Sequence, residues 1–407
     1  MLKSILQDAV RYDKRWLPLC LLLYKYKRDR KLLKLMPFKN ISQSPVHEKS
    51  VLQPGYMGRS YGPKSFSTGH QKIAEVQHPD LYFRVFLDAR VSAHSSSVVS
   101  RDDEIYVEMI PGGERDVDYR GGHILMHGPC SAIVKAGEPE CLEKGIFLAG
   151  NGSYNYYHWL VEISAKSQLL GDLPDDYADY PIFVSQKVRD IPSFTNILNA
   201  LIKDRDVIYM DPRQSYRVGS LVWIDTPNLL PFNMVGDQPL RAVDCYTRKK
   251  SIEYLRSRLL VEMEECAGET KAERVFLARK PGSRDYNQDE VEMLLSRYGF
   301  ATVYMENLDY REQVETIRAA KYIIGPTGAA WTNLIYANKG TCCLCWMAEE
   351  YGDFAAFSNI ANIVSADMTY LRGQCGEKVV SQIYKASYRI DLDEVEAFLK
   401  KHVSAVV

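Results

Sequence analysis

Two residues near the middle of the chain have the types and spacing of an acid–base pair. His158 and Glu162 lie four positions apart in the stretch Tyr-Tyr-His-Trp-Leu-Val-Glu, and in a helix that spacing puts both on one face. A histidine with aromatic neighbours and a carboxylate one turn away has the ingredients of a general base near neutral pH. The alternative is a core histidine that bonds to Glu162 for packing. The pair alone leaves both interpretations open.

A group of cations follows a predicted strand in the second half of the chain. The run Arg274–Lys280 reads as a strand that carries Arg279 and Lys280 at its carboxyl end, where ligands of open α/β sheets bind. An arginine fork and a lysine point charge together can hold a diphosphate. Arg284, in the next loop, is a third candidate for that role. Structurally, the same residues can be solvated loop charges.

The stretch Lys321–Trp346 predicts a strand, a turn, a helix and a second strand. The first strand, Tyr322–Ile324, ends at Gly325 and Pro326, because proline lacks a backbone donor and restricts the residue before it. A tight turn at Thr327 then leads into a helix through Tyr336. Small residues leave the backbone N–H groups at the helix start accessible to an anion, and these are Gly328, Ala329 and Ala330. The alternative is a purely structural turn.

The elements around these residues alternate in the manner of an α/β fold. Strands are predicted in the first half at 81–87, 93–99, 104–110, 133–135, 146–148, 181–184, 207–209 and 220–224, with a helix at 194–202. In the second half we expect helices at 241–266, 288–298 (capped by Asn287), 310–320 and 331–336, and strands at 274–280, 301–305, 322–324 and 342–346. Residues 39–69 read as a loop or linker, and 225–239 as a connection between domains.

The charge balance and the cysteine content of the chain limit the partners and the cellular compartment that we expect for it. The 51 Lys and Arg residues nearly balance the 52 Asp and Glu residues. The protein therefore has no overall positive electrostatic potential that would favour binding to nucleic acid. The nine cysteines have no regular spacing, which favours reduced thiols in a cytosolic protein over a disulfide framework. We therefore expect a cytoplasmic protein that does not bind nucleic acid. The oligomeric state is not predicted.

The first 40 residues form a basic arm with eleven Lys or Arg against three Asp. The apolar run Trp16–Tyr24 is about half of the roughly 20 residues that a membrane-spanning helix requires, and no cleavage site of a signal peptide follows it. One interpretation is peripheral contact with an anionic membrane at the inner face of the cytoplasmic membrane. The other is a helix packed on its own domain, with a solvated basic face.

Several short motifs predict neither a metal site nor a redox site. His123 and His127 are flanked by glycines and have no third ligand nearby. The cysteines of 342–345 lie in a predicted buried strand, where cysteine behaves as a small hydrophobe. Acidic Asp-x-Asp triplets are common by chance, and those of this chain are 116–118, 204–206 and 391–393.

Three blocks of the chain resemble glycosyltransferase family 61, the DUF563 group. The blocks are 156–162, 276–280 (Phe-Leu-Ala-Arg-Lys) and 323–337 (Ile-Ile-Gly-Pro-Thr-Gly-Ala-Ala-Trp-Thr-Asn-Leu-Ile-Tyr-Ala), in the order of the family. The resemblance covers roughly 146–363. It implies a GT-B fold, in which two Rossmann-like domains face each other across a cleft. It also implies inverting transfer from a nucleotide sugar, usually without a metal, and in bacteria a link to capsule or other surface polysaccharide synthesis.

The resemblance also assigns roles to residues of this chain. It puts His158 in the acceptor-side catalytic site with Glu162 beside it, and Arg279 and Lys280 in the cationic block that holds the donor diphosphate. The residues that match the donor-binding turn and helix are Gly325, Gly328, Ala329, Thr332 and Asn333.

This chain departs from the family pattern at two positions. Thr327 stands where a histidine is common, and it can hydrogen-bond a phosphate but carries no charge. Cys345 stands where an acidic residue near the nucleotide ribose is often found, and Glu349 or Glu350 is a candidate to replace it.

We therefore predict an inverting, metal-independent glycosyltransferase without a cofactor, acting on a nucleotide-sugar donor and a glycan or glycoconjugate acceptor. His158 would deprotonate the acceptor hydroxyl, and the cations would stabilise the leaving diphosphate. The alternative is a non-catalytic nucleotide- or glycan-binding protein on the same fold. The predicted parts are an arm and linker (1–70), an acceptor-side domain (71–235), a donor domain (240–385) and a C-terminal helix that packs back towards the first domain (386–407).

Overall fold

The computed structural model describes residues 30–38, 41, 46–108, 119–128, 130–230, 239–261, 271–282, 284–375 and 387–403. Most of the predicted basic arm, the triplet 116–118 and most of the predicted connection between domains lie outside these ranges. Within them, no helix is both long and apolar enough to cross a membrane.

The chain divides into two compact units that interleave along the sequence. The first contains residues 1–56, 79–227 and 231–236, and the second contains 57–78, 228–230 and 237–407. Residues 57–78 therefore belong with the C-terminal half of the chain, although they precede most of the first unit. Each unit is mixed α/β and contains a large sheet with a parallel portion.

The sheet of the first unit has the strand order β12-β11-β10-β13-β5-β6-β7-β1-β9-β8, and β2 also pairs with β5. The parallel strands are β10 (Glu140–Phe147), β11 (Ile182–Ser185), β12 (Val207–Met210) and β13 (Tyr216–Ile224). Beyond them the pairing is mostly antiparallel, through β5 (Leu81–Val91), β6 (Ser97–Val99), β7 (Glu104–Val107), β1 (Arg30–Pro37), β9 (Ser131–Lys135) and β8 (Ile124–His127).

Aromatic packing joins the two central parallel strands of this unit. Phe147 and Trp223 are register partners at the carboxyl ends of β10 and β13, and both are fully buried. Their rings stack with centroids 5.0 Å apart. This aromatic core therefore lies next to the carboxyl ends of β10 and β13, where the loops after these two strands begin.

The prediction of a loop over 39–69 is wrong. That range contains β2 (Glu48–Gln53) and β3 (Tyr56–Tyr61), of which β2 pairs with β5 and β3 pairs with β4 (Ile73–His78). Most side chains of β2 and β3 are exposed or half-buried, so these strands lack the alternation of apolar and polar residues that marks a half-buried strand in a sequence. Backbone pairing determines their structure instead.

The sheet of the second unit has the strand order β15-β14-β16-β17-β18-β19, and all of its pairs are parallel except the last. Its strands are β14 (Arg274–Leu277), β15 (Ala301–Val303), β16 (Tyr322–Pro326), β17 (Cys342–Ala348), β18 (Asp367–Cys375) and β19 (Tyr388–Arg389). In chain order the five parallel strands read 2-1-3-4-5, which is a common doubly wound arrangement.

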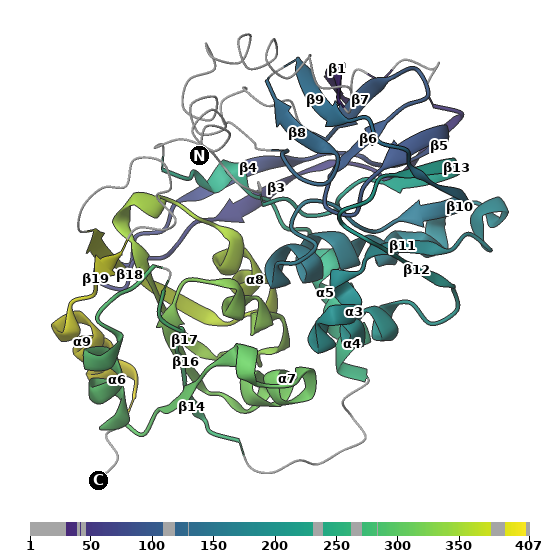
Figure 1. Ribbon diagram of the computed structural model, residues 1–407. Helices are drawn as coiled ribbons and strands as arrows, with labels where there is room; N and C mark the ends of the chain where they lie inside the picture. Colours follow the sequence, from purple (N-terminus) through teal and green to yellow (C-terminus); the bar gives the residue numbers. More distant parts are fainter. Residues whose placement is uncertain are drawn as a thin grey trace. The chain divides into compact units, whose positions relative to one another are not determined.

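Helices cover both faces of this second sheet (Figure 1). On one face, α6 (Gln288–Ser296) packs against α9 (Leu392–His402), whereas η8 (Ala329–Tyr336), a 3₁₀ helix, contacts α5 (Lys249–Val261), α7 (Tyr310–Ala319) and α8 (Ala356–Val364). The C-terminal helix α9 thus packs on α6 within its own unit. Among the described residues of the first unit, the α-helices are α3 (Lys187–Asp190) and α4 (Pro192–Leu201).

One helix starts later than predicted, and another starts as predicted but lacks the predicted capping bond. The helix predicted from residue 241 begins only at Lys249, after a short turn at Ala242–Asp244. The predicted cap Asn287 makes no capping hydrogen bond to α6. Its side chain instead pairs in both directions with the backbone of Ile390, at 2.9 and 3.0 Å, because the strand that leads into α9 passes beside it.

Candidate functional site

In the first unit, His158 follows the strand at which the sheet order reverses. The chain leaves β10, builds β11 and β12 on one side, and then returns to place β13 on the other side of β10. Ligands of open α/β sheets bind beside the carboxyl ends of strands at such a reversal. The loop after β10 leads to η3 (His158–Ile163), a π-helix, and this rare helix type is frequent at functional sites.

His158 and Glu162 form a buried pair. Nδ1 of His158 lies 2.5 Å from Oε2 of Glu162, and the two residues are 6% and 7% exposed. Because an ionised carboxylate only accepts hydrogen bonds, this contact places the imidazole proton on Nδ1. Nε2 is then the basic nitrogen. The structure thus confirms that the two side chains pair, which a base and a packing histidine would both require.

The loop before η3 is fixed by hydrogen bonds to a second loop, at residues 92–96. Asn151 and Ser96 bond to each other twice, through Ser96 N to Asn151 Oδ1 and Asn151 N to Ser96 Oγ, both at 2.9 Å. Just before η3, Oδ1 of Asn155 accepts from the N–H of Tyr157 at 3.0 Å. These bonds position the helix start from two sides.

Gly152 lies directly against the histidine. Its φ angle is +82°, and a Cβ added there would lie 2.7 Å from His158 Cβ and 2.8 Å from His158 Cγ. A side chain at this position would therefore both strain the backbone and displace the ring. The sequence shows the glycine but not this contact.

In the second unit, the predicted cationic block meets the predicted helix start. The strand order reverses between β14 and β16, and Arg279 and Thr327 follow these two strands. Nη2 of Arg279 donates to the carbonyl oxygen of Thr327 and would lie 3.0 Å from a Cβ on Gly328. Two segments predicted to act together are thus in direct contact. They lie at the edge where a doubly wound sheet binds its ligands.

The start of η8 presents backbone donors beside this guanidinium. Gly328, Ala329 and Ala330 are half-exposed, and no described residue accepts a hydrogen bond from their N–H groups. The first N–H groups of a helix have no partner inside it and attract anions. Arg279 and this helix start together can therefore hold an anionic group.

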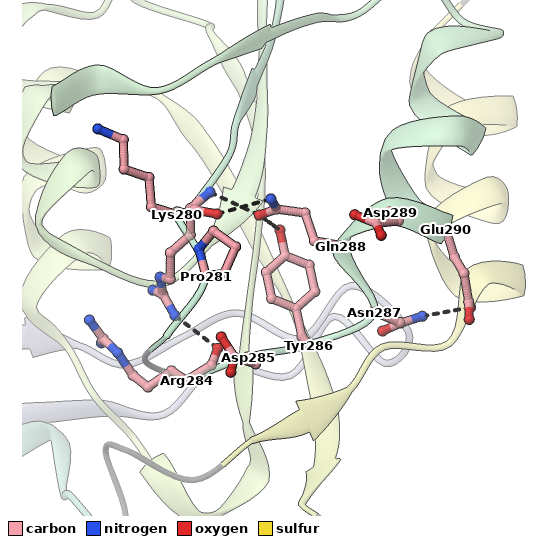
Figure 2. Close-up of a pocket in the computed structure, with 10 residues that line it drawn as sticks. Lys280, Pro281, Arg284, Asp285, Tyr286, Asn287, Gln288, Asp289 and Glu290 are labelled. Atoms are coloured by element: carbon pink, nitrogen blue, oxygen red, sulfur yellow. Dashed lines mark hydrogen bonds between the residues drawn. The ribbon is translucent and has the colours of Figure 1, made fainter. Parts of the chain in front are cut away.

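A pocket of about 410 Å³ adjoins Arg279 (Figure 2). Its walls come from the segment between Arg279 and Glu290. Gln288 holds the wall in place, since its side chain accepts from Arg279 N at 2.8 Å and donates to Arg279 O at 2.9 Å. The hydroxyl of Tyr286 donates to the same amide oxygen at 2.9 Å.

Two arginines lie close together at this pocket, whose lining also includes Asp285, Asp289 and Glu290. Burial, and secondly the positive charge of Arg284, lower the pKa of Arg279. Arg279 also donates through Nη1 to the Arg284 carbonyl oxygen at 3.2 Å. Two cations held this close favour an anion between or beside them.

Other predicted donor residues have different environments. The ammonium of Lys280 donates to Asn307 Oδ1 at 2.7 Å. Thr332 and Asn333 are buried within η8 at 0% and 1% exposed. Gly325 packs so closely on β14 that an added Cβ would lie 2.6 Å from Leu277 O. These last three shape the turn from inside the unit.

The structure shows why Cys345 is not the residue to compare with the acidic residue of the family pattern. Cys345 lies inside β17, fully buried, and burial raises the pKa of its thiol. The strand continues to Ala348, so the first residues beyond its carboxyl end are Glu349 and Glu350. The position expected for an acidic residue is therefore occupied by these glutamates.

Two residues at this sheet edge escaped the sequence reasoning. Tyr388 stacks on Tyr286 with ring centroids 5.8 Å apart, and its buried hydroxyl has no hydrogen-bond partner among the described residues. Arg372, near the end of β18, acts electrostatically on Cys345 together with Arg279. A lone arginine near the end of a strand of apolar residues was the available signal for Arg372. Tyr388 lies in β19, a two-residue antiparallel strand that no sequence pattern predicts.

The two histidines with four-residue spacing are structural in this fold. His123 is buried and its Nε2 lies 2.9 Å from Ser97 Oγ, whereas His127 Nε2 accepts from the backbone N–H of Tyr119 at 2.8 Å. Among the residues that the structure describes, no three His, Cys, Asp or Glu side chains gather as metal ligands.

Comparison with known families completes the description. Residues 156–344 match the family model described as Glycosyltransferase 61. This segment belongs to glycosyltransferase family 61. It begins two residues before His158, contains Arg279 and the start of η8, and ends inside β17. The family 61 match supports a transferase. A search of curated proteins found no match to the chain.

Proposed function

We propose that this protein transfers a sugar from a nucleotide-sugar donor to a hydroxyl group of a glycan or glycoconjugate, with inversion at the anomeric carbon. One observation carries the proposal. In each unit, a chemically suited group lies where the order of the parallel strands reverses: the His158–Glu162 pair in the first unit, and Arg279 with the start of η8 in the second. Strand-order reversals are where ligands of such sheets bind.

The chemistry assigns one task to each unit. Nε2 of His158 takes the proton of the acceptor hydroxyl, while the Glu162 carboxylate orients the ring and stabilises the imidazolium that forms. Arg279 and the N–H groups at Gly328 and Ala329 stabilise the negative charge of the departing diphosphate. The proton moves to the protein, and the bonding electrons of the sugar–oxygen bond leave with the nucleotide.

A GT-B arrangement, with the two units facing each other across the reacting sugar, is part of the proposal. So is a reaction that needs neither a metal nor another cofactor. The family resemblance supports both. Lys280, Arg284 and Thr327 remain proposed donor contacts. The buried residues Gly325, Thr332 and Asn333 remain proposed parts of the donor site. We further propose action in bacterial surface polysaccharide synthesis, at the inner face of the cytoplasmic membrane, with the basic N-terminal arm touching anionic lipid.

The test begins with donor identification. Thermal unfolding is measured with a panel of UDP-, GDP-, dTDP- and CMP-sugars, because a ligand at about 100 times its dissociation constant stabilises by about 2.7 kcal/mol. A stabilising donor is then incubated with candidate glycan acceptors. Nucleotide release that requires both substrates, with an inverted anomeric configuration in the product, is the expected result. Binding without turnover would instead favour a non-catalytic nucleotide- or glycan-binding protein, and an unchanged configuration would reject inversion.

A further inference from the structure

His94 is a histidine of the first unit that the proposed chemistry does not use. It lies in the loop of residues 92–96, and its Nε2 is 3.0 Å from Oγ of Ser185. Ser185 is the last residue of β11, the parallel neighbour of β10. The imidazole is therefore held at the carboxyl end of a strand beside the strand-order reversal, where ligands of such sheets bind.

The backbone around His94 is fixed against the loop before η3. The carbonyl oxygen of Ala93 accepts from the N–H of Gly150 at 3.1 Å and from the hydroxyl of Ser153 at 3.2 Å. From another side, Gly121 approaches so closely that an added Cβ would lie 2.5 Å from the carbonyl oxygen of His94. These contacts set the position of the imidazole relative to the segment that leads to the proposed base.

The ring of Tyr154 lies beside this imidazole. The two ring centroids are 5.3 Å apart, with an angle of 55° between the ring planes. Tyr154 is 50% exposed, so its ring meets solvent as well as His94. It follows by two residues Gly152, whose backbone lies against His158. One short segment therefore carries both the exposed aromatic ring and the proposed base.

The imidazole of His94 is uncharged near neutral pH. Burial, and secondly the charge of Lys187, lower its pKa, and Lys187 is itself paired, with Nζ 3.1 Å from Oδ2 of Asp190. One nitrogen of a neutral imidazole donates and the other accepts, and no described residue bonds to Nδ1 of His94. A hydroxyl group both donates and accepts, so it suits Nδ1 in either tautomer.

An exposed aromatic ring with a neutral hydrogen-bonding group beside it is suited to a sugar. A pyranose has an apolar face of C–H groups that packs on an aromatic ring, and hydroxyl groups around its rim that need polar partners. We propose that Tyr154 and His94 form a subsite for an uncharged sugar of the acceptor, in which Tyr154 packs on the sugar face and Nδ1 of His94 bonds to one hydroxyl. The inference rests on the proposed function, because that function assigns the acceptor to the first unit.

The first test measures sugar binding without a donor or turnover. Saturation-transfer difference NMR is recorded for the intact protein with methyl glycosides of glucose, galactose, mannose, xylose and N-acetylglucosamine. We expect at least one glycoside to bind, and its dissociation constant to rise about tenfold in Y154A, which loses the aromatic contact. Y154F keeps the ring and should recover most of the affinity. A panel in which no glycoside binds, or in which wild type and Y154A bind equally well, overturns the inference.

H94F tests the polar half of the subsite. It keeps an aromatic ring against Tyr154 but removes both nitrogens, so the same glycoside should bind about fivefold more weakly through the loss of one hydrogen bond. Unchanged affinity in a folded H94F protein removes His94 from the subsite and overturns the inference. Should H94F fail to fold, Y154A decides, because its position is exposed.

Tyr56 offers a matched control. It is a tyrosine of the same unit with a similar exposure of 43%, and it lies in β3. Y56A should leave glycoside binding unchanged. An equal loss of affinity in Y56A and Y154A would contradict a specific role for Tyr154.

Kinetics separate this inference from the proposed function. With the donor found by thermal shift and the acceptor that supports nucleotide release, Y154A should raise the acceptor KM about tenfold while kcat and the donor KM change less than twofold. An unchanged acceptor KM overturns the inference and leaves the transfer itself intact. Absence of transfer by the wild type would reject the proposed function, while glycoside binding still decides the roles of Tyr154 and His94.

Discussion

Replacing Gly152 with alanine should damage catalysis far more than folding. The added Cβ would lie 2.7 Å from His158 Cβ, whereas carbon atoms in contact are about 3.5 to 4.0 Å apart. The imidazole must therefore move by about 1 Å. A misplacement of that size can cost on the order of 100-fold in rate, equivalent to about 2.7 kcal/mol of transition-state stabilisation.

Gly340 provides the control, because its φ angle is also +82° and no atom lies within 4 Å of an added Cβ. Both alanine variants carry the cost of a left-handed backbone, about 1 to 2 kcal/mol. Only G152A adds the contact with His158. Thermal unfolding should therefore show a loss of stability in both variants.

The decisive comparison is the rate of nucleotide release with saturating donor and acceptor. G340A should retain most of the wild-type kcat, and G152A should fall by about two orders of magnitude while its donor affinity is unchanged. A G152A variant as active as G340A would refute the claim that the position of His158 governs catalysis.

Two further predictions concern donor binding and stability against acid. R279Q should weaken nucleotide binding about 10-fold to 100-fold through the loss of charge-assisted hydrogen bonds. R258Q, at an exposed position of α5, should bind nucleotides normally. Isothermal titration calorimetry with the identified donor decides, and equal affinities would remove Arg279 from the site. Burial, with smaller effects of Arg90 and Lys135, lowers the pKa of His123 from 6.5 to about 3. The folded protein therefore holds His123 neutral at pH values where the unfolded chain takes up a proton. Above pH 6.5 this costs no stability, and as the pH falls from 6.5 towards 3 the free energy of unfolding decreases by about 1.4 kcal/mol per pH unit. H123Q should therefore flatten the decline in urea-unfolding free energy between pH 6.5 and 4.5, and an unaltered slope would contradict this.

Local sequence patterns predicted the parts of the fold whose strands are buried. The buried run of β16 and the mostly buried run of β17 were recognisable, and their parallel neighbours place Arg279 and Thr327 at one edge, as expected. The failures lie where the pattern is absent. β2 and β3 form by backbone pairing with few buried side chains. Local patterns locate strand ends only to within a few residues, so the sequence predicts an end at Trp346 for β17, which continues to Ala348.

The candidate site was predictable only in its local contacts. His158 and Glu162 pair because they are four residues apart, and this spacing is visible in the sequence. The bonds that hold the loop before η3 are not visible in it, because Ser96 and Asn151 lie 55 residues apart along the chain. The contact of Gly152 with the histidine ring likewise depends on a loop conformation that its neighbours in the chain do not determine.

H158Q tests whether His158 is the base of a sugar transfer. Donor affinity and acceptor-dependent nucleotide release are measured side by side in wild type and variant. If His158 is the base, H158Q binds the donor within about twofold of wild type, and its transfer rate falls at least 100-fold, in the range that a positioned base contributes. An H158Q enzyme that still transfers sugar at the wild-type rate would contradict this role.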